Sequence, residues 1–267
     1  MTMTKTRIAI HGAAGRMGRR LVALGSADHE LQIVAALDCA GHPALGQDAG
    51  TLAGVPALGV PLTATLDTDA DVLIDFSLPA GAASAIEVCR RRQLPLVMAT
   101  TGLEDEQKQE LRAASAQIPI VWAPSMSLAV NLTMKLATLA ANALKSASSS
   151  VDVEIIERHH RFKKDSPSGT ALRFGELIAA ELGLTSQVHG REGVLGERPR
   201  NEIGYHAVRA GDNPGEHTIL FGLLGESVEL TVRATNRDCY VQGAFAAAKF
   251  LAGRAPGLYT MNDVLGL

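Results

Sequence analysis

Residues 157–171, with the sequence ERHHRFKKDSPSGTA, carry the densest group of side chains suited to acid–base chemistry and anion binding. His159 and His160 stand side by side, and the residues around them are cationic: Arg158, Arg161, Lys163 and Lys164. Such a cluster favours an anionic substrate, and a histidine within it can donate a proton near neutral pH. The pattern therefore predicts proton transfer to a small anionic molecule.

The end of this stretch has the composition of a helix start. Ser168 suits the N-cap position, which leaves the backbone amides of Gly169 and Thr170 free to bind a carboxylate. Together with the cations, these amides predict a substrate that carries carboxylate groups.

A second chemical signal is the turn GAAGRMG, in which Gly12, Gly15 and Gly18 follow an apolar strand and open a helix. The three glycines suit a tight turn, close backbone approach to a diphosphate and close helix packing. Asp38 follows Gly18 by about 20 residues, at the end of the next strand, where a carboxylate would bind ribose hydroxyls. These features predict a nicotinamide dinucleotide site.

The cofactor expected here is NADH or NADPH, with NADH favoured. Asp38 would repel a 2′-phosphate, and the next residue, Cys39, has no positive charge to pair with one. Arg16 lies in the glycine turn and is a candidate partner for that phosphate, which weakens the preference.

Strand-like and helix-like segments alternate through the first half of the sequence. This alternation predicts βαβ units in a parallel sheet that helices cover. The segments expected as strands are 7–11, 31–37, 71–77, 95–102 and 119–125. In an open parallel sheet, ligands bind at the loops that follow the strands. The glycine turn is therefore expected at the ligand-binding edge.

The pattern changes after about residue 126. A helix carrying Leu128, Leu132, Leu136 and Leu139 precedes an alternating strand at 151–155, a helix near 170–182 and three turn-separated strands. A closing helix is expected from about Gly243 to Ala252. The fold class is thus α/β: a Rossmann-like doubly wound parallel sheet with a second α+β domain that contains a mixed sheet.

Composition excludes several classes of function. The net charge of −3 has no long run of one sign, which argues against a nucleic-acid partner. The three cysteines are far apart, which argues against a disulfide framework or a thiolate zinc site. Pro119 and Pro124 interrupt the uncharged stretch 113–134, and the first apolar segment is too short for a secretory signal. We therefore expect a cytoplasmic protein with no membrane partner.

Five segments of the chain resemble the dihydrodipicolinate reductase family: GAAGRMG (12–18), ATTG (99–102), EIIERHHRFKKDSPSGTA (154–171), VRAGDNPGEHT (208–218) and NRDCYVQGA (236–244). The resemblance runs nearly end to end, and its longest pattern, E-x-H-H-x-x-K-x-D-x-P-S-G-T-A, is specific. It implies NAD(P)H-dependent reduction of 4-hydroxy-tetrahydrodipicolinate (dihydrodipicolinate) to tetrahydrodipicolinate in the diaminopimelate route of lysine biosynthesis.

The resemblance also implies an organisation. Residues 1–126 and 237–267 would form the dinucleotide-binding domain, to which the last helix returns. Residues 127–236 would form the domain that binds the dicarboxylate substrate and builds a homotetramer.

By matching position, the resemblance gives roles to individual residues. His159 would be the general acid and Lys163 the second catalytic cation, while His160, Gly169 and Thr170 would hold the substrate carboxylates. No metal is implied. The residues that would line the cofactor are Gly12, Ala13, Ala14, Gly15, Arg16, Met17, Asp38, Ala99, Thr100, Thr101, Ala123, Pro124, Ser125 and Met126.

Some positions depart from the family pattern. Ser125 and Met126 stand where the family has Asn and Phe, so a side-chain amide contact to the cofactor would be lost. Ala99 replaces a common Gly, and Cys39 replaces an Arg found in several members. Arg237 is a further candidate in the substrate domain, although its neighbours differ from the pattern.

Three other functions fit parts of the sequence. A dehydrogenase of another small acid would keep the fold, but the histidine-containing pattern argues against it. A redox sensor would bind the dinucleotide without turnover. A hydrolase could use His159, His160 and Asp165 as metal ligands, but adjacent histidines after a strand point in different directions.

Overall fold

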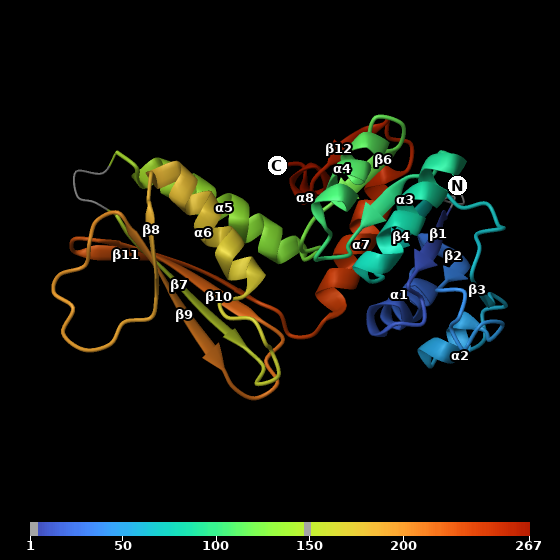
Figure 1. The fold of residues 1–267 in the computed structure, drawn as a ribbon, viewed down its shortest axis with the longest axis horizontal. Helices are drawn as coiled ribbons and strands as arrows, with labels where there is room; N and C mark the ends of the chain where they lie inside the picture. The colour runs from blue at the N-terminus through green and yellow to red at the C-terminus, as the bar shows by residue number, and fades with distance from the viewer. Residues whose placement is uncertain (1–4, 147–150) are drawn as a thin grey trace. The chain divides into compact units, whose positions relative to one another are not determined.

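The computed structural model describes residues 5–146 and 151–267, which divide into two compact units (Figure 1). One unit contains the chain up to Leu128 together with Asp238–Leu267, and the other contains Ala129–Arg237. The first unit is therefore built from two separate stretches of sequence.

The first unit is centred on a parallel sheet. In sheet order its strands are β12 (Gly257–Tyr259), β6 (Pro119–Trp122), β5 (Leu96–Met98), β4 (Val72–Asp75), β1 (Thr6–His11), β2 (Leu31–Leu37) and β3 (Leu62–Thr63). The strand order reverses between β1 and β4, which is where a doubly wound fold opens its ligand crevice.

Helices cover both faces of this sheet. They are α1 (Arg16–Ala27), α2 (Ala49–Ala53), α3 (Pro79–Arg92), α4 (Asp105–Ala114), α7 (Asp238–Leu251) and α8 (Met261–Leu265). Successive strand residues point to opposite faces, so Ile8 and Ile10 pack toward α1 and α7 while Ala9 packs toward α3 and α4. The predicted doubly wound α/β class is confirmed.

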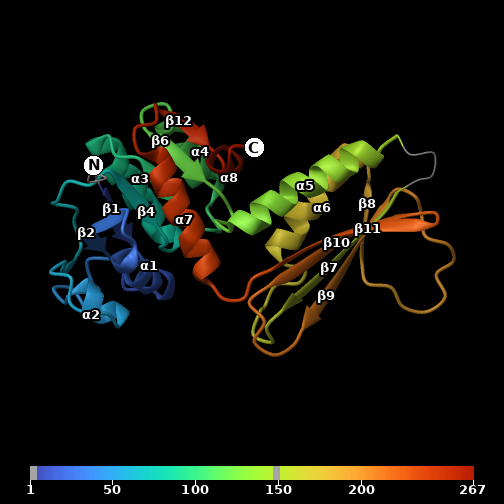
Figure 2. The same ribbon diagram turned by 180° about the vertical axis from the view of Figure 1, so that it is seen from behind.

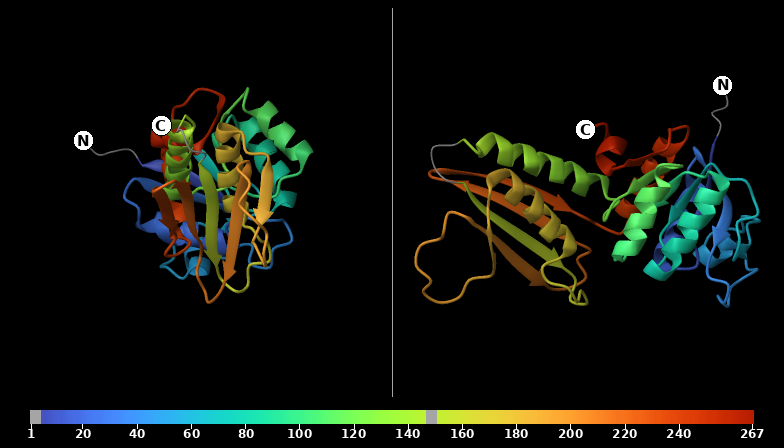
Figure 3. Two further views of the ribbon diagram at one scale, coloured as in Figure 1. Left: turned by 90° about the vertical axis from the view of Figure 1, so that its left-hand side faces the viewer. Right: turned by 45° about the horizontal axis from the view of Figure 1, so that its top comes forward.

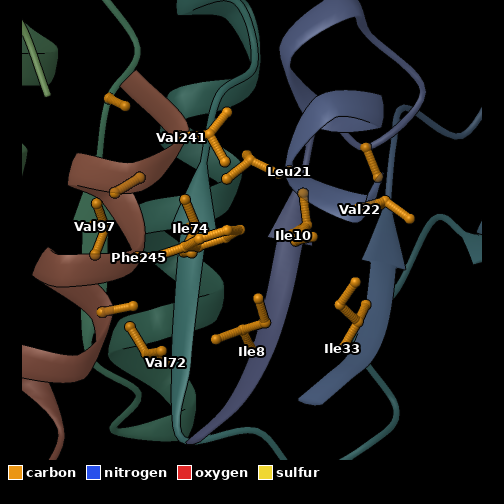
Figure 4. Packing of buried hydrophobic residues seen from close by; sticks show 14 of the residues in the cluster. Ile8, Ile10, Leu21, Val22, Ile33, Val72, Ile74, Val97, Val241 and Phe245 are labelled. Atoms are coloured by element: carbon orange, nitrogen blue, oxygen red, sulfur yellow. The ribbon is translucent and has the colours of Figure 1, made fainter. Parts of the chain in front are cut away.

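Helix α7 joins the end of the chain to the sheet formed by the first half. It lies beside α1 (Figure 2), and its Phe245 packs against Ile74 near Val97 (Figure 4). The helix begins at Asp238, earlier than the predicted Gly243, because Asp238 pairs with Arg20 of α1 and places a carboxylate in the first turn, where the helix dipole favours it. The short β12 and α8 were not predicted.

The second unit has a mixed sheet with the order β11-β10-β7-β9-β8. Its strands are β7 (Asp152–His159), β8 (Ser186–His189), β9 (Glu202–Arg209), β10 (Glu216–Leu223) and β11 (Glu226–Arg233). Strand β10 is antiparallel to both of its neighbours, whereas β7, β9 and β8 run parallel. The predicted mixed sheet is confirmed.

Two helices, α5 (Leu128–Leu144) and α6 (Gly169–Leu182), pack on one face of this sheet (Figure 3). The leucine-containing helix forms as predicted, but its leucines do not all face the core. Small residues such as Ala137 and Ala141 face the sheet, while Leu132, Leu136 and Leu139 are 40%, 43% and 52% exposed. Alanines allow a closer approach of the helix backbone to the sheet.

In the described residues, no helix combines the length and the apolar composition needed to cross a bilayer.

Candidate active site

The most buried acid–base pair of the second unit joins Glu157 and His159 of β7. They stand two residues apart, so the alternation of the strand places both side chains on the helix-covered face. Nδ1 of His159 lies 2.6 Å from a carboxylate oxygen of Glu157, and Glu157 is fully buried. A carboxylate only accepts hydrogen bonds, so this partner assigns the ring hydrogen to Nδ1.

Three further donors surround the Glu157 carboxylate. The Ser168 amide donates at 3.0 Å, and Nη1 and Nη2 of Arg209 donate at 2.7 Å each. Burial alone would raise the pKa of Glu157, but the hydrogen bonds from His159, Arg209 and Ser168 outweigh it and hold the pKa at about 2. Glu157 is therefore a fixed negative charge behind His159.

This network predicts a specific sensitivity to acid. The pKa of Glu157 falls from an ordinary 4.5 to about 2 on folding, so its stabilisation is complete above about pH 4.5 and is lost as the pH falls toward 2. We expect the free energy of unfolding to fall more steeply between pH 7 and pH 3 in the wild type than in Glu157→Gln. Urea unfolding at both pH values measures this difference. An equal fall in the free energy of unfolding in the wild type and in Glu157→Gln would argue against the predicted role of Glu157.

His217 of β10 completes the buried wall. Its ring meets that of His159 edge-on at 5.2 Å, and its Nε2 lies 3.1 Å from the Ser168 hydroxyl. That hydroxyl accepts the Ala171 amide as the N-cap of α6, so its hydrogen is available to His217. Burial, followed by repulsion from His159, lowers the pKa of His217 to about 4. His217 is therefore neutral at pH 7, and its ring does not add to the local positive charge.

The second nitrogen of His159 faces Gly215. A Cβ built on Gly215 would lie 2.9 Å from Nε2, and the φ of +153° there favours glycine. The absence of a side chain leaves room beside Nε2, which is the ring nitrogen that Glu157 does not hold.

The other predicted substrate residues lie in the segment that leads from β7 into α6. Nζ of Lys163 lies 2.9 Å from a carboxylate oxygen of Asp165. Nδ1 of His160 is shielded from solvent and meets no hydrogen-bond partner within the described residues. The amides of Gly169 and Thr170 lie in the first turn of α6, where no intrahelical acceptor exists. A ligand with acceptor oxygens would satisfy the two amides, whereas Lys163 already has Asp165 as its partner.

The glycine turn of the first unit has the geometry of an anion site. Gly12 has a φ of +77°, and a Cβ on Gly18 would lie 2.0 Å from the Gly12 carbonyl oxygen, so α1 approaches the turn closely. Gly15 caps α1 without a side-chain hydrogen bond, and no acidic residue stands in the first turn. The positive end of α1 is thus available to a diphosphate.

Asp38 closes this turn from the end of β2. Its two carboxylate oxygens accept the amides of Ala14 at 3.0 Å and Cys39 at 2.9 Å. Each oxygen keeps a further lone pair for a ribose hydroxyl. Cys39 and Arg16 are both exposed.

The remaining predicted cofactor residues follow neighbouring strands of the same sheet. Ala99, Thr100 and Thr101 follow β5, and Ala123 to Met126 follow β6, so both segments lie at the carboxyl edge that carries the glycine turn. The Ser125 hydroxyl accepts the Ser127 amide at 3.3 Å, within its own loop. Ala13, Ala14 and Ala99 are buried, whereas Met17 is half-buried.

Four residues of the site lie outside the set that the sequence predicts: Glu157, Arg209, His217 and Gly215. The spacing of Glu157 and His159 could have indicated their contact, because residues two apart on a strand share a face. Arg209 and His217 reach the site from β9 and β10, so their approach depends on strand pairing. Within the described residues, no group of three or more His, Cys, Asp or Glu side chains is placed to hold a metal ion.

Comparison with known proteins adds independent observations. The family model described as dihydrodipicolinate reductase, N-terminus, matches residues 6–126, and its C-terminal counterpart matches residues 129–265. The 4-hydroxy-tetrahydrodipicolinate reductase of Rhodopirellula baltica is 59% identical over 268 residues, which cover 97% of this chain and 96% of that protein. The protein of the same name from Alkalilimnicola ehrlichii is 51% identical, covering 98% and 99%.

Two solved structures have a fold similar to that of this chain. Dihydrodipicolinate reductase from Paenisporosarcina sp. TG-14, solved with dipicolinate bound, is similar with a TM-score of 0.77 and 28% identity, covering 96% of this chain and 98% of that one. An amine dehydrogenase from Mycobacterium smegmatis has a TM-score of 0.67 at 13% identity, covering 98% and 96%, and shares the fold.

Proposed function

The chain belongs to the dihydrodipicolinate reductase family, and from that premise we propose how its own residues divide the chemistry. The reaction is the NAD(P)H-dependent reduction of 4-hydroxy-tetrahydrodipicolinate to tetrahydrodipicolinate in the diaminopimelate route of lysine biosynthesis. The first unit binds the dinucleotide in this proposal, and the second binds the dicarboxylate.

His159 is the general acid of the proposed mechanism. Glu157 holds Nδ1, so the transferred proton leaves from Nε2, beside the space that Gly215 keeps open. Before the transfer, the fixed Glu157 carboxylate stabilises the positively charged ring of His159. After the transfer, the ring is neutral and its Nδ1 hydrogen still donates to Glu157. This buried Glu157–His159 pair is the observation that carries the assignment.

The substrate carboxylates bind to Lys163, to the start of α6 and to His160 in this proposal. Lys163 supplies a cation that would exchange Asp165 for the substrate, the Gly169 and Thr170 amides supply the helix start, and the shielded Nδ1 of His160 supplies a further polar contact. The cations stabilise the electron-rich species that reduction creates, since charge develops there in the transition state.

The cofactor site fits a dinucleotide on physical grounds. A Cβ at Gly12 or Gly18 would meet neighbouring backbone, so the glycines allow the tight turn and the close approach of α1. The uncapped start of α1 would receive a diphosphate, and Asp38 would bind ribose hydroxyls. When bound, the reduced nicotinamide supplies the hydride. Ala99 to Thr101 and Ala123 to Met126 line the rest of the proposed site.

A coupled assay tests this function. A dihydrodipicolinate synthase generates the unstable substrate, and the absorbance of NADH or NADPH is followed after this protein is added. Consumption of reduced cofactor that requires the synthase supports the proposal. Dinucleotide binding without turnover would favour a sensor, and turnover of a different acid would reassign the substrate.

We further propose that NADH is preferred, because Asp38 faces the ribose and Cys39 offers no charge to a 2′-phosphate. The variant Cys39→Arg is expected to raise kcat/KM for NADPH about tenfold relative to NADH, because a guanidinium pairs with phosphate. Initial rates with both cofactors measure the ratio, and Cys39→Ser is the size-matched control. A wild type that favours NADPH would reverse the assignment.

A cytoplasmic homotetramer is the assembly that we propose. The exposed leucines of α5 and the exposed Val208 and Val228 on the sheet strands offer apolar surface for contact between protomers. Cys39, Cys89 and Cys239 form no disulfide in the described part of the chain, which is compatible with a reducing compartment. Analytical ultracentrifugation tests the assembly.

A further inference from the structure

A chain of hydrogen bonds lies beneath the proposed cofactor site and is not used by the mechanism above. Nδ1 of His11 lies 2.6 Å from one carboxylate oxygen of Asp75, and the Thr100 hydroxyl donates to the other oxygen at 2.6 Å. The carboxylate accepts from both partners, so His11 donates through Nδ1. Asp75 thus joins two side chains that are far apart in the sequence.

The three residues come from neighbouring elements at one edge of the sheet. His11 is the last residue of β1, Asp75 is the last residue of β4, and the two are register partners in the parallel pair. Thr100 follows the end of β5, whose Met98 is the register partner of Asp75. The hydrogen-bond chain therefore spans the point where the strand order reverses, and His11 immediately precedes the glycine turn.

Burial makes this arrangement rigid. Asp75 is fully buried, Thr100 is 4% exposed, and the His11 side chain is 14% exposed. A buried carboxylate that loses a donor is costly, so both partners are held in place. The main chain adds a further tie, since the Ala99 amide donates to the Asp75 carbonyl at 3.0 Å.

We propose that His11 and Asp75 are positioning residues for the reaction: through Thr100 they hold segment 99–101 in the conformation that receives the dinucleotide. The inference rests on the proposed function, in which this segment lines the cofactor. Because the Thr100 hydroxyl is turned inward onto Asp75, the segment contacts the cofactor through its backbone and through the exposed Thr101.

The pair Thr100→Val and Thr100→Ser separates the hydroxyl from the shape of the side chain. Valine keeps the shape and removes the donor, whereas serine keeps the donor and removes a methyl group. We expect Thr100→Val to raise the KM for NADH about tenfold with kcat changed less than about threefold, and Thr100→Ser to raise the KM by clearly less than Thr100→Val does. A role in packing alone predicts the reverse order, and that order would overturn the inference.

Asp75→Asn tests the central residue, with Asp71→Asn as its matched control. Asp71 also links β1 to the β4 strand, through Arg7 at 2.7 Å, but it lies at the opposite end of β4. We expect Asp75→Asn to raise the KM for NADH at least as much as Thr100→Val and Asp71→Asn to leave it unchanged. Equal effects at both sites would show general destabilisation and would overturn the inference, and the Thr100 pair decides the matter if Asp75→Asn does not fold.

A binding measurement keeps this inference separate from the proposed function. Titration of NADH fluorescence gives a dissociation constant for every variant without turnover. A tenfold weaker dissociation constant in Thr100→Val supports the inference even if the wild type does not reduce the expected substrate. An unchanged constant in Thr100→Val and Asp75→Asn contradicts it even if the wild type is fully active.

Discussion

Replacing His159 by glutamine is expected to lower kcat by a factor on the order of 10² to 10⁴, with the dissociation constant for NADH unchanged. Glutamine approximates the size of the ring and can hydrogen-bond to Glu157, but it cannot deliver a proton from the position of Nε2. The coupled assay measures kcat, and NADH fluorescence measures the dissociation constant.

His206→Gln is the matched control for this substitution. His206 also pairs with a carboxylate, since its Nε2 lies 2.7 Å from an oxygen of Glu154, but this pair lies on the other face of the same sheet. We expect turnover close to that of the wild type. A comparable loss in both variants would attribute the effect to the sheet and would remove His159 from the role of general acid.

Replacing Lys163 by methionine is expected to lower kcat/KM for the dicarboxylate by a factor on the order of 10² to 10³, because the charge that stabilises the electron-rich species is lost. Methionine keeps most of the apolar stem, so the substitution removes charge more than volume. Steady-state rates at saturating NADH measure the effect.

Lys164→Met tests whether the effect belongs to one position or to the whole basic stretch. Lys164 is exposed and contributes only to the long-range field, which salt screens. We expect a loss of at most a few-fold that disappears as the ionic strength rises. Equal and salt-sensitive losses in both variants would mean that Lys163 steers the substrate without stabilising the reaction.

Local sequence patterns predicted much of the fold. The strand Leu31–Leu37 occupies the residues that the pattern predicts, because continuous apolar runs in a covered parallel sheet depend on little besides burial. The inward face of α5 was harder to predict, since apolar residues surround the helix. Its alanines, and not its leucines at 132, 136 and 139, allow close packing on the sheet.

The candidate site also contains features that local sequence predicts and contacts that it does not. The helix start at Ser168 and the glycine turn are local features, and the structure shows both. The surroundings of His159 are not local: Arg209 comes from a parallel neighbour of β7, and His217 comes from an antiparallel one. Strand pairing decides these contacts, and a single sequence does not reveal which strands pair.

The origin of the first unit from two stretches of sequence affects folding during synthesis. Residues 129–237 are contiguous, so their mixed sheet and both of its helices leave the ribosome together and can form a core at once. The parallel sheet must wait for α7, because Phe245 and its neighbours cover the face that carries Ile74 and Val97. A nascent chain released before residue 238 would expose that apolar face, so the cell makes a complete second unit before it can make a stable first unit.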